Sequence, residues 1–451
     1  MDNQNIRYER RTLSGGVPVY FILNPQSTNL YMSVDFAAGS AHERANEYGA
    51  AHALEHAFFL GTETRDQAAL YNAGRQWGKT GSRNAATSET SLMFNCLNAP
   101  HTYGGPVAAF NGTNSVSLVT QHARAMVDHL SDLLLRPCFP SDLSAEEFRL
   151  IANEIGWSHD RPEQYFDNHV APHFFEAPYS HSVAALKEDV MKLTLSDLLA
   201  FRDRYVGTSN MSVWVCGPDM PVDEITAYLD QGFAAMPAAE KAAPLVCRLR
   251  EGDIRVSNPF YQQNHIDILL AQPYPRTPEE EAHRYMARLL VGDGLNSQMR
   301  LQTPASYSYG ISYLEEPGML AYRLSAYPGA EDTAACARIL LDTVSRAREW
   351  VTEETFEGYR QSQSNLVFPL NARDIYRAAR DALRLYHDVS AISKNAIYAN
   401  MRYEDVLPHI DDLAARPFGT ACTGPVPEAM PTLEALRTSP QPQALSRYTI
   451  A

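Results

Sequence analysis

Apolar and polar positions in the first half of the chain follow strand spacing in some segments and helix spacing in others. Leu30–Ala37 has apolar residues at every second position, the period of a half-buried strand. Val116–Leu135 repeats its apolar residues at helical spacing instead. The pattern predicts further strands at Val17–Leu23, Asn84–Leu97 and Met211–Cys216, and further helices near Asn46–Leu60, Arg65–Trp77, Ser144–His159 and Leu195–Tyr205.

The second half repeats this order of elements. Its pattern predicts strands at His265–Leu270 and Met319–Tyr327, and helices at Pro278–Val291, Asp332–Val351 and Thr355–Leu366. Residues 238–253, rich in Ala, Pro and charge, read as a linker between the halves. We therefore expect an α+β fold of two similar domains, residues 1–237 and 254–451, each a mostly antiparallel sheet covered by helices.

Composition excludes several classes of protein. The 451 residues are 45% apolar and 20% charged, which is ordinary for a globular chain with sizeable cores. The net charge of −15 argues against nucleic acid or an anionic membrane as a partner, and no apolar run is long enough to span a bilayer. The six cysteines are scattered without a C-x-x-C pair, and the N-terminus has no apolar leader. We expect a cytoplasmic location.

One motif carries candidate chemistry. The segment GAAHALEHAFFLGT (Gly49–Thr62) contains H-x-x-E-H as His52, Glu55 and His56. On a helix, residues four apart share one face, so the two imidazoles can bind one metal ion with a carboxylate beside it. A single histidine on such a helix is more often a core residue than a ligand. Two histidines and a glutamate at this spacing, among small residues, favour a metal site.

A third ligand is sought on another helix, because a catalytic zinc usually has three protein ligands and one open position. Glu147 and Glu154 are seven residues apart in the expected helix 144–159 and share a face. Taken alone, these two glutamates are more simply read as part of a solvated helix surface.

The motif resembles the signature of the pitrilysin family, which includes insulin-degrading enzyme and the mitochondrial processing peptidase. The matching positions are Gly49, His52, Leu54, Glu55, His56, Phe59, Gly61 and Thr62. The resemblance implies one Zn²⁺ per chain, held by His52, His56 and Glu154, with Glu55 as the general base and Glu147 in support. The separation of Glu154 from the motif is longer than is usual in the family, and the loop Asn98–Asn114 resembles an insertion that accounts for it.

Other segments extend the resemblance. NAATSE (Asn84–Glu89) resembles the family's edge strand, which implies that Asn84, Ala85 and Thr87 bind substrate backbone. The second half has no H-x-x-E-H, as in a family in which only the first of two related domains holds zinc. Arg300 and Tyr307 have the spacing of a substrate-binding pair, although the residues between them depart from the family pattern. Tyr309 offers a competing register, and all three are equally readable as ordinary surface or core residues.

The resemblance implies a zinc metalloendopeptidase that cleaves peptides or unfolded segments inside a chamber. In the family four related domains form the chamber, and this chain supplies two, so we expect a homodimer or a heterodimer with a related chain. The alternative is a non-catalytic structural or regulatory subunit on the same fold. A metal-storage protein is a third reading that no feature favours. We expect neither nucleic acid nor membrane among its partners.

Overall fold

The computed structural model describes residues 6–27, 29–76, 85–98, 116–140, 145–158, 165–302, 306–316, 319–365, 371–389 and 393–438. The chain forms two compact units. One comprises Met1–Pro172, Ala177–Leu245 and Val367–Ser393, and the other comprises His173–Glu176, Val246–Leu366 and Lys394–Ala451. Among the described residues, no helix is both long enough and apolar enough to cross a bilayer.

The first unit is built on a six-stranded sheet with the order β1-β2-β6-β3-β5-β4. Its described strands pair antiparallel except for β2 and β6, which are parallel. The strands are β1 (Arg7–Thr12), β2 (Pro18–Leu23), β3 (Leu30–Phe36), β4 (Ala85–Thr87), β5 (Leu92–Asn98) and β6 (Met211–Gly217).

The prediction of a single strand over Asn84–Leu97 is wrong. The structure has two strands there, β4 and β5, separated by a turn in which the hydroxyl of Ser88 accepts hydrogen bonds from the amides of Thr90 and Ser91. The loop expected at Asn98–Asn114 lies, apart from Asn98, outside the described residues.

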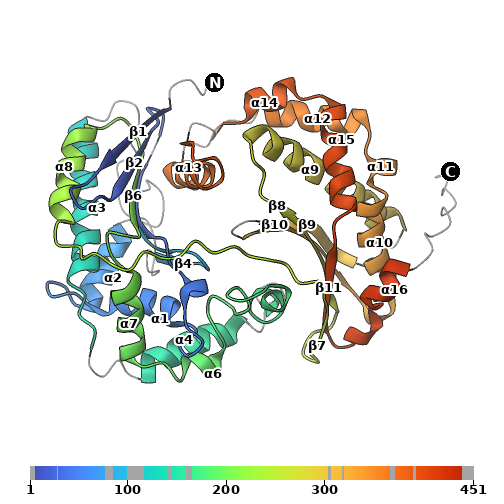
Figure 1. Ribbon diagram of the computed structural model, residues 1–451, viewed down its shortest axis with the longest axis horizontal. Coiled ribbons are helices and arrows are strands. Elements are labelled where there is room, and N and C mark those ends of the chain that lie inside the picture. Colours follow the sequence, from blue (N-terminus) through green and yellow to red (C-terminus); the bar gives the residue numbers. More distant parts are fainter. Residues whose placement is uncertain are drawn as a thin grey trace. The chain divides into compact units, whose positions relative to one another are not determined.

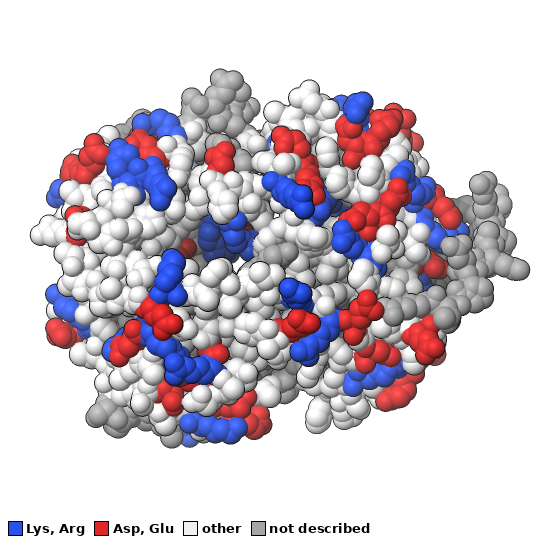
Figure 2. All heavy atoms as spheres, viewed as in Figure 1, with Lys and Arg blue, Asp and Glu red and all other residues white. Residues whose placement is uncertain are grey.

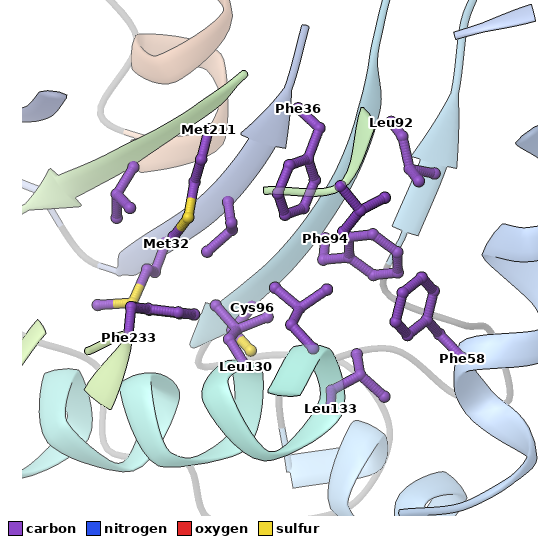
Figure 3. Packing of buried hydrophobic residues seen from close by; sticks show 14 of the residues in the cluster. Met32, Phe36, Phe58, Leu92, Phe94, Cys96, Leu130, Leu133, Met211 and Phe233 are labelled. Carbon is purple, nitrogen blue, oxygen red and sulfur yellow. The ribbon is translucent and has the colours of Figure 1, made fainter. Parts of the chain in front are cut away.

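Helices cover one face of this sheet and enclose its main core. Strand residues such as Met32, Phe36 and Phe94 lie in one cluster with Leu130 and Leu133 of α3 (Figure 3). The helical segments of this unit are η2 (Ser40–His42), α1 (Ala50–Ala57), η3 (Phe58–Leu60), α2 (Gln67–Gln76), α3 (Val116–Leu135), α4 (Ala145–Ser158), η4 (Phe166–Val170), η5 (Ala171–Phe174, of which the last two residues fall in the second unit), α6 (Lys187–Val190), α7 (Leu195–Tyr205), α8 (Val222–Gly232) and α13, which is described below.

Helix α1 is shorter than the segment Asn46–Leu60 expected for it. It begins at Ala50, because Gly49 has the left-handed φ of 90°, which a right-handed helix cannot continue. A 3₁₀ turn follows it and ends at Gly61, whose φ is 158°. Two glycines therefore limit the motif helix to about two turns.

The opposite face of the first sheet is covered by α13 (Ala372–Tyr386), a helix from late in the chain (Figure 1). Its Ile375 and Tyr376 pack against Tyr20, Tyr31 and Trp214 of the sheet. The sequence analysis did not predict this helix. Its place could not be predicted either, because the residues on either side of it belong to the second unit.

The second unit contains a five-stranded sheet with the order β7-β11-β8-β10-β9. Its described strands are antiparallel except for β7 and β11. The strands are β7 (Asp253–Ser257), β8 (His265–Pro273), β9 (Ser306–Glu316), β10 (Met319–Pro328) and β11 (Phe418–Gly424). The helical segments are α9 (Pro278–Gln302), η6 (Ala330–Asp332), α10 (Thr333–Ser345), α11 (Ala347–Trp350), α12 (Glu353–Ser364), α14 (Asn395–Asn400), α15 (Tyr403–Ala414), η8 (Pro427–Ala429) and α16 (Leu433–Thr438).

The second core lies between this sheet and α9, α10, α12 and α15. Helix α9 extends eleven residues beyond the expected end at Val291, and the helix expected over Asp332–Val351 is divided into α10 and α11. The unit is thus a sheet covered by helices, like the first.

On the strands, Asp267 is buried between His265 and Arg323, and these two partners outweigh burial and lower the pKa of Asp267 to about 2.

Candidate metal centre

Helix α1 places His52 and His56 one turn apart, with their ring centroids 4.7 Å apart. His56 is buried and His52 is half-buried. Among the described residues, Nδ1 of His52 is buried without a hydrogen-bond partner. Such an atom is costly in a folded protein unless a ligand or ion completes its contacts.

Helix α4 brings Glu154 to the same place. Its Oε2 lies 3.5 Å from Nε2 of His56, although its side chain is 58% exposed. One ligand atom from each of His52, His56 and Glu154 lies within 4.8 Å of the other two. Two ligands on one tetrahedral zinc, at bond lengths near 2.1 Å, lie about 3.4 Å apart. The separation of His56 and Glu154 therefore fits a shared zinc ion.

The donor set also fits zinc. Two imidazoles and one carboxylate are a common ligand set of catalytic zinc, which leaves the fourth position open. Within the described part of the chain, no other group of three His, Cys, Asp or Glu side chains lies this close together.

Glu55 lies on the same helix as the two histidines, and its carboxylate is hydrogen-bonded to a residue of the edge strand β4. It is 8% exposed, and its Oε2 accepts a hydrogen bond of 2.6 Å from the hydroxyl of Thr87. Thr87 ends β4, one of the two edge strands of the described sheet, and Ala85 begins it. Asn84, the third residue expected to bind substrate, lies outside the described residues.

Glu147 lies on α4 two turns before Glu154. The two glutamates thus share the helix that the sequence assigned to them. The structure brings Glu154 to the histidines and leaves the supporting role of Glu147 a prediction.

In the second unit, Arg300 lies near the end of α9 and Tyr307 lies in β9. The side chain of Tyr307 is outside the described ones. The Nε of Arg300 donates a hydrogen bond of 3.3 Å to the hydroxyl of Tyr309. Arg300 therefore contacts the tyrosine of the competing register.

Residues around the start of α1 were missed by the sequence reasoning. Both carboxylate oxygens of Glu43 accept hydrogen bonds, from the amides of Gly49 and Ala51. Burial raises the pKa of Glu43, and hydrogen bonds from His181 and the two amides partly offset this effect. An acidic residue shortly before a glycine that precedes a helix was the available signal.

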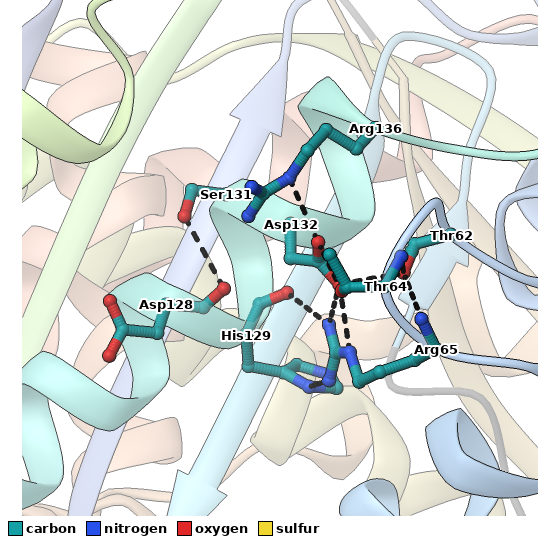
Figure 4. Close-up of polar contacts among 8 residues, drawn as sticks. All are labelled: Thr62, Thr64, Arg65, Asp128, His129, Ser131, Asp132 and Arg136. Atoms are coloured by element: carbon teal, nitrogen blue, oxygen red, sulfur yellow. Dashed lines mark hydrogen bonds and ion pairs between the residues drawn. The ribbon is translucent and has the colours of Figure 1, made fainter.

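The end of the motif is held by a second buried carboxylate (Figure 4). Asp132 of α3 accepts hydrogen bonds from Thr62, Thr64 and Arg65, and Arg136 lies 3.0 Å from it. Four of these residues, Thr64, Arg65, Asp132 and Arg136, help to line a cavity of about 390 Å³. The hydroxyl of Thr62, the last residue of the motif, is one of the donors to Asp132, which gives a physical reason for a threonine at this position.

The architecture and the cluster together define a class: two-unit chains of sheet and helix whose first unit carries the motif H-x-x-E-H on a helix. The domain described as "Insulinase (Peptidase family M16)" matches residues 19–185. The domain described as "Peptidase M16 inactive domain" matches residues 192–363. The chain belongs to peptidase family M16, and the resemblance drawn from its motif is confirmed.

Similar proteins agree with this assignment. An uncharacterized zinc protease of Rickettsia felis is 20% identical over 79% of this chain and 82% of its own length. A probable mitochondrial-processing peptidase subunit beta of Schizosaccharomyces pombe is 28% identical over 44% of this chain and 39% of its own length. The crystal structure of a protease from Helicobacter pylori has a TM-score of 0.77 and 16% identity, and the match covers 93% of this chain and 100% of that one. This likeness confirms the expected two-domain α+β fold.

Proposed function

We propose that this chain is a zinc-dependent metalloendopeptidase. The observation that carries the proposal is the convergence of His52 and His56 from α1 with Glu154 from α4, whose ligand atoms lie within 4.8 Å of one another. The 3.5 Å between His56 and Glu154 is a separation that one zinc ion can bridge. Glu55 lies on the same helix with its carboxylate held by Thr87. The relative from Rickettsia felis is named a zinc protease, which supports the same activity.

His52, His56 and Glu154 would hold the ion, which when bound supplies a Lewis acid that acidifies water and polarises the scissile carbonyl. Glu55 takes the proton of the attacking water and passes it to the leaving amine. The Thr87 hydroxyl fixes the rotamer of Glu55, so that its carboxylate needs little rearrangement during the reaction. The role proposed for Glu147 is to orient one of the metal ligands or to balance the charge around the ion.

Substrate binds as an added strand along β4. This strand is an edge of the described sheet, and peptide backbones add to such edges through main-chain hydrogen bonds. Asn84, Ala85 and Thr87 are the residues assigned to this contact. Backbone recognition gives affinity with little sequence selectivity, so peptides and unfolded segments are the expected substrates. Arg300 and Tyr307 are proposed as further substrate-binding residues.

The alternative is a non-catalytic subunit of a peptidase of this family. The description "inactive domain" favours it, but that match covers residues 192–363. The metal cluster and Glu55 all lie within the insulinase match at residues 19–185. A subunit that had lost its activity is expected to have lost at least one of these residues, so we favour the enzyme.

We further propose that two chains act together, as a homodimer or with a related partner, because one chain supplies only two of the four domains that enclose the family's chamber. The Schizosaccharomyces pombe relative is named as a subunit, which supports assembly of this kind. The cytoplasmic location stays a prediction.

Glu55→Gln tests the activity. The variant keeps the size of the side chain and its hydrogen bond to Thr87 but removes the proton acceptor, so cleavage of an unstructured peptide should fall by about 100-fold or more. Zinc content, measured by atomic absorption, should stay at one ion per chain, because Glu55 is not a ligand.

Glu154→Gln is the matched variant, because it should lose zinc as well as activity. Full turnover by Glu55→Gln, or a purified wild-type chain that neither binds zinc nor cleaves peptide, contradicts the proposal.

A further inference from the structure

The first turn of α1 is held by a side chain from outside the helix. The helix begins after Gly49, which has no side chain to cap it. Instead, Oε2 of Glu43 accepts a hydrogen bond of 2.9 Å from the amide of Gly49, and Oε1 accepts one of 2.7 Å from the amide of Ala51. The first amides of a helix have no partner within it, and negative charge is favourable at this end. Glu43 meets both needs.

Glu43 is itself fixed by His181. The Nε2 of His181 lies 3.3 Å from Oε2 of Glu43 and 3.0 Å from the carbonyl oxygen of Ser40. The ring stacks on Tyr48 with the centroids 4.1 Å apart. Among the described residues, Nδ1 of His181 is buried without a partner, so the ring proton belongs on Nε2, where two acceptors face it. The carboxylate thus has a donor on its outer side.

The same segment is bonded to the turn that follows the edge strand. The amides of Ser40 and Ala41 donate to the carbonyl oxygens of Ser88 and Glu89, at 3.1 and 2.9 Å. A Cβ at Gly39 would overlap the carbonyl oxygen of Ser88, so only glycine permits this approach. Residues 39–43 therefore connect the β4–β5 turn to the start of α1.

We infer that Glu43 is a positioning residue for the metal centre. An eight-residue helix has little stability of its own, and its ends open first. His52 directly follows Ala51, so loss of the Glu43 cap loosens the turn that carries one ligand. It also loosens the register between α1 and β4, and with it the contact of Glu55 with Thr87. The inference rests on the proposed function.

The test is Glu43→Gln, with Glu47→Gln as its matched control. A glutamine side chain at position 43 can accept only one of the two helix hydrogen bonds and turns an N–H group toward the other donor. Glu47 lies in the same loop and is also buried, but its carboxylate pairs with Arg204 of α7 rather than with amides of α1. Both variants lose a buried interaction, and only one loses the cap.

Zinc affinity is measured by competition with a chromophoric chelator, beside kcat, KM and the thermal midpoint. Glu43→Gln should bind Zn²⁺ roughly 10- to 100-fold more weakly and lose kcat with little change in KM, as for other residues that orient metal ligands. Glu47→Gln should lose stability and keep its zinc affinity within about threefold of wild type.

His181→Phe is the second variant, for the case in which Glu43→Gln does not fold. It keeps the ring on Tyr48 but removes the donor to Glu43, and it should weaken zinc binding in the same direction by a smaller factor. If wild type binds zinc and both Glu43→Gln and His181→Phe match the affinity of Glu47→Gln, the inference is wrong and the proposed function stands. If wild type binds no zinc, both are wrong.

Discussion

Buried polar side chains in the first unit lie where several donors or acceptors meet them. Asp132 receives hydrogen bonds from Thr62, Thr64 and Arg65, and these donors outweigh burial and lower its pKa. Beside it, Nδ1 of His129 lies 2.7 Å from Arg65 Nη1. A guanidinium only donates, so this imidazole nitrogen must accept and the folded protein favours the neutral ring.

One contribution to the pH dependence of stability comes from His129, which is 6% exposed. Burial and the nearby Arg65 lower its pKa to about 4, from an ordinary 6.5, and Asp132 offsets this only in part. Above pH 6.5 its contribution to stability is complete. As the pH falls from 6.5 to 4, only the unfolded chain gains the proton, so stability falls. His129→Gln should reduce the loss between about pH 7.5 and 4.5 by about 2–3 kcal/mol.

Urea unfolding of the metal-free protein at the two pH values measures this difference. His173→Gln, at an exposed histidine, is the control and should retain the pH dependence of wild type. An equal loss of stability in wild type and His129→Gln would contradict the assignment.

At the level of single residues, the sequence predicted the candidate metal ligands better than the buried carboxylates that hold the two ends of the motif. Spacing alone placed His52, Glu55 and His56 on one helix, and the structure does so. Glu154 needed the family resemblance, because nothing local pairs α4 with α1. Asp132 could not be predicted, since the fold alone brings it to Thr62. Glu43 had only a local signal, an acidic residue shortly before the helix, which does not say that its partners are backbone amides.

Among the elements, α13 is the one whose place the sequence could not indicate. The helix is strongly amphipathic, but the pattern does not say which sheet its apolar face covers. Strands and helices with a clear period, such as β3 and α3, were predicted within a few residues. The short strand β4 was not separated from β5, because the polar residues of the tight serine turn fit a strand pattern equally well.

The contact of α13 with the first sheet depends on a buried hydrogen bond. The hydroxyl of Tyr376 donates to Oδ2 of Asp35 at 2.6 Å, and Ser33 donates to the other oxygen. Burial raises the pKa of Asp35, so each donor matters. Tyr376→Phe should lower the free energy of unfolding by roughly 1–3 kcal/mol, because it removes a donor and leaves the carboxylate buried.

Tyr20→Phe is the matched control for this prediction in urea unfolding. Tyr20 is buried in the same cluster, whereas the hydrogen bonds to Asp35 come from Ser33 and Tyr376. The two variants should differ by about 1 kcal/mol or more. Equal effects would show that packing alone, rather than the hydrogen bond, holds α13.

For the whole molecule, charge does not by itself identify a substrate. The net charge is −15, yet acidic and basic side chains are interspersed on the face drawn in Figure 2. A preference for basic peptides would need an acidic surface near the metal centre.

The two-unit architecture was predictable because both halves repeat one order of elements. The exchange of segments between the units was not, since residues 367–393 fold with the first.

The proposed assembly predicts a particle of twice the chain mass. Each chain has a mass of 50.3 kDa, so light scattering of the purified protein should give about 100 kDa if two chains enclose the chamber. Dilution to monomer should lower the rate of peptide cleavage in step with dissociation. A monomer that cleaves peptides at the full rate would show that one chain suffices.

The position of α13 also determines when the first unit can be completed during synthesis. Strand β6, the last strand of the first sheet, ends at Gly217, whereas the helix that covers its aromatic face ends at Tyr386. At roughly 5–20 residues per second, the ribosome needs about 10–30 s to make the intervening chain. During that time Tyr20, Tyr31 and Trp214 have no cover from α13. The nascent chain therefore passes through an interval in which this sheet face is open to aggregation and to chaperones.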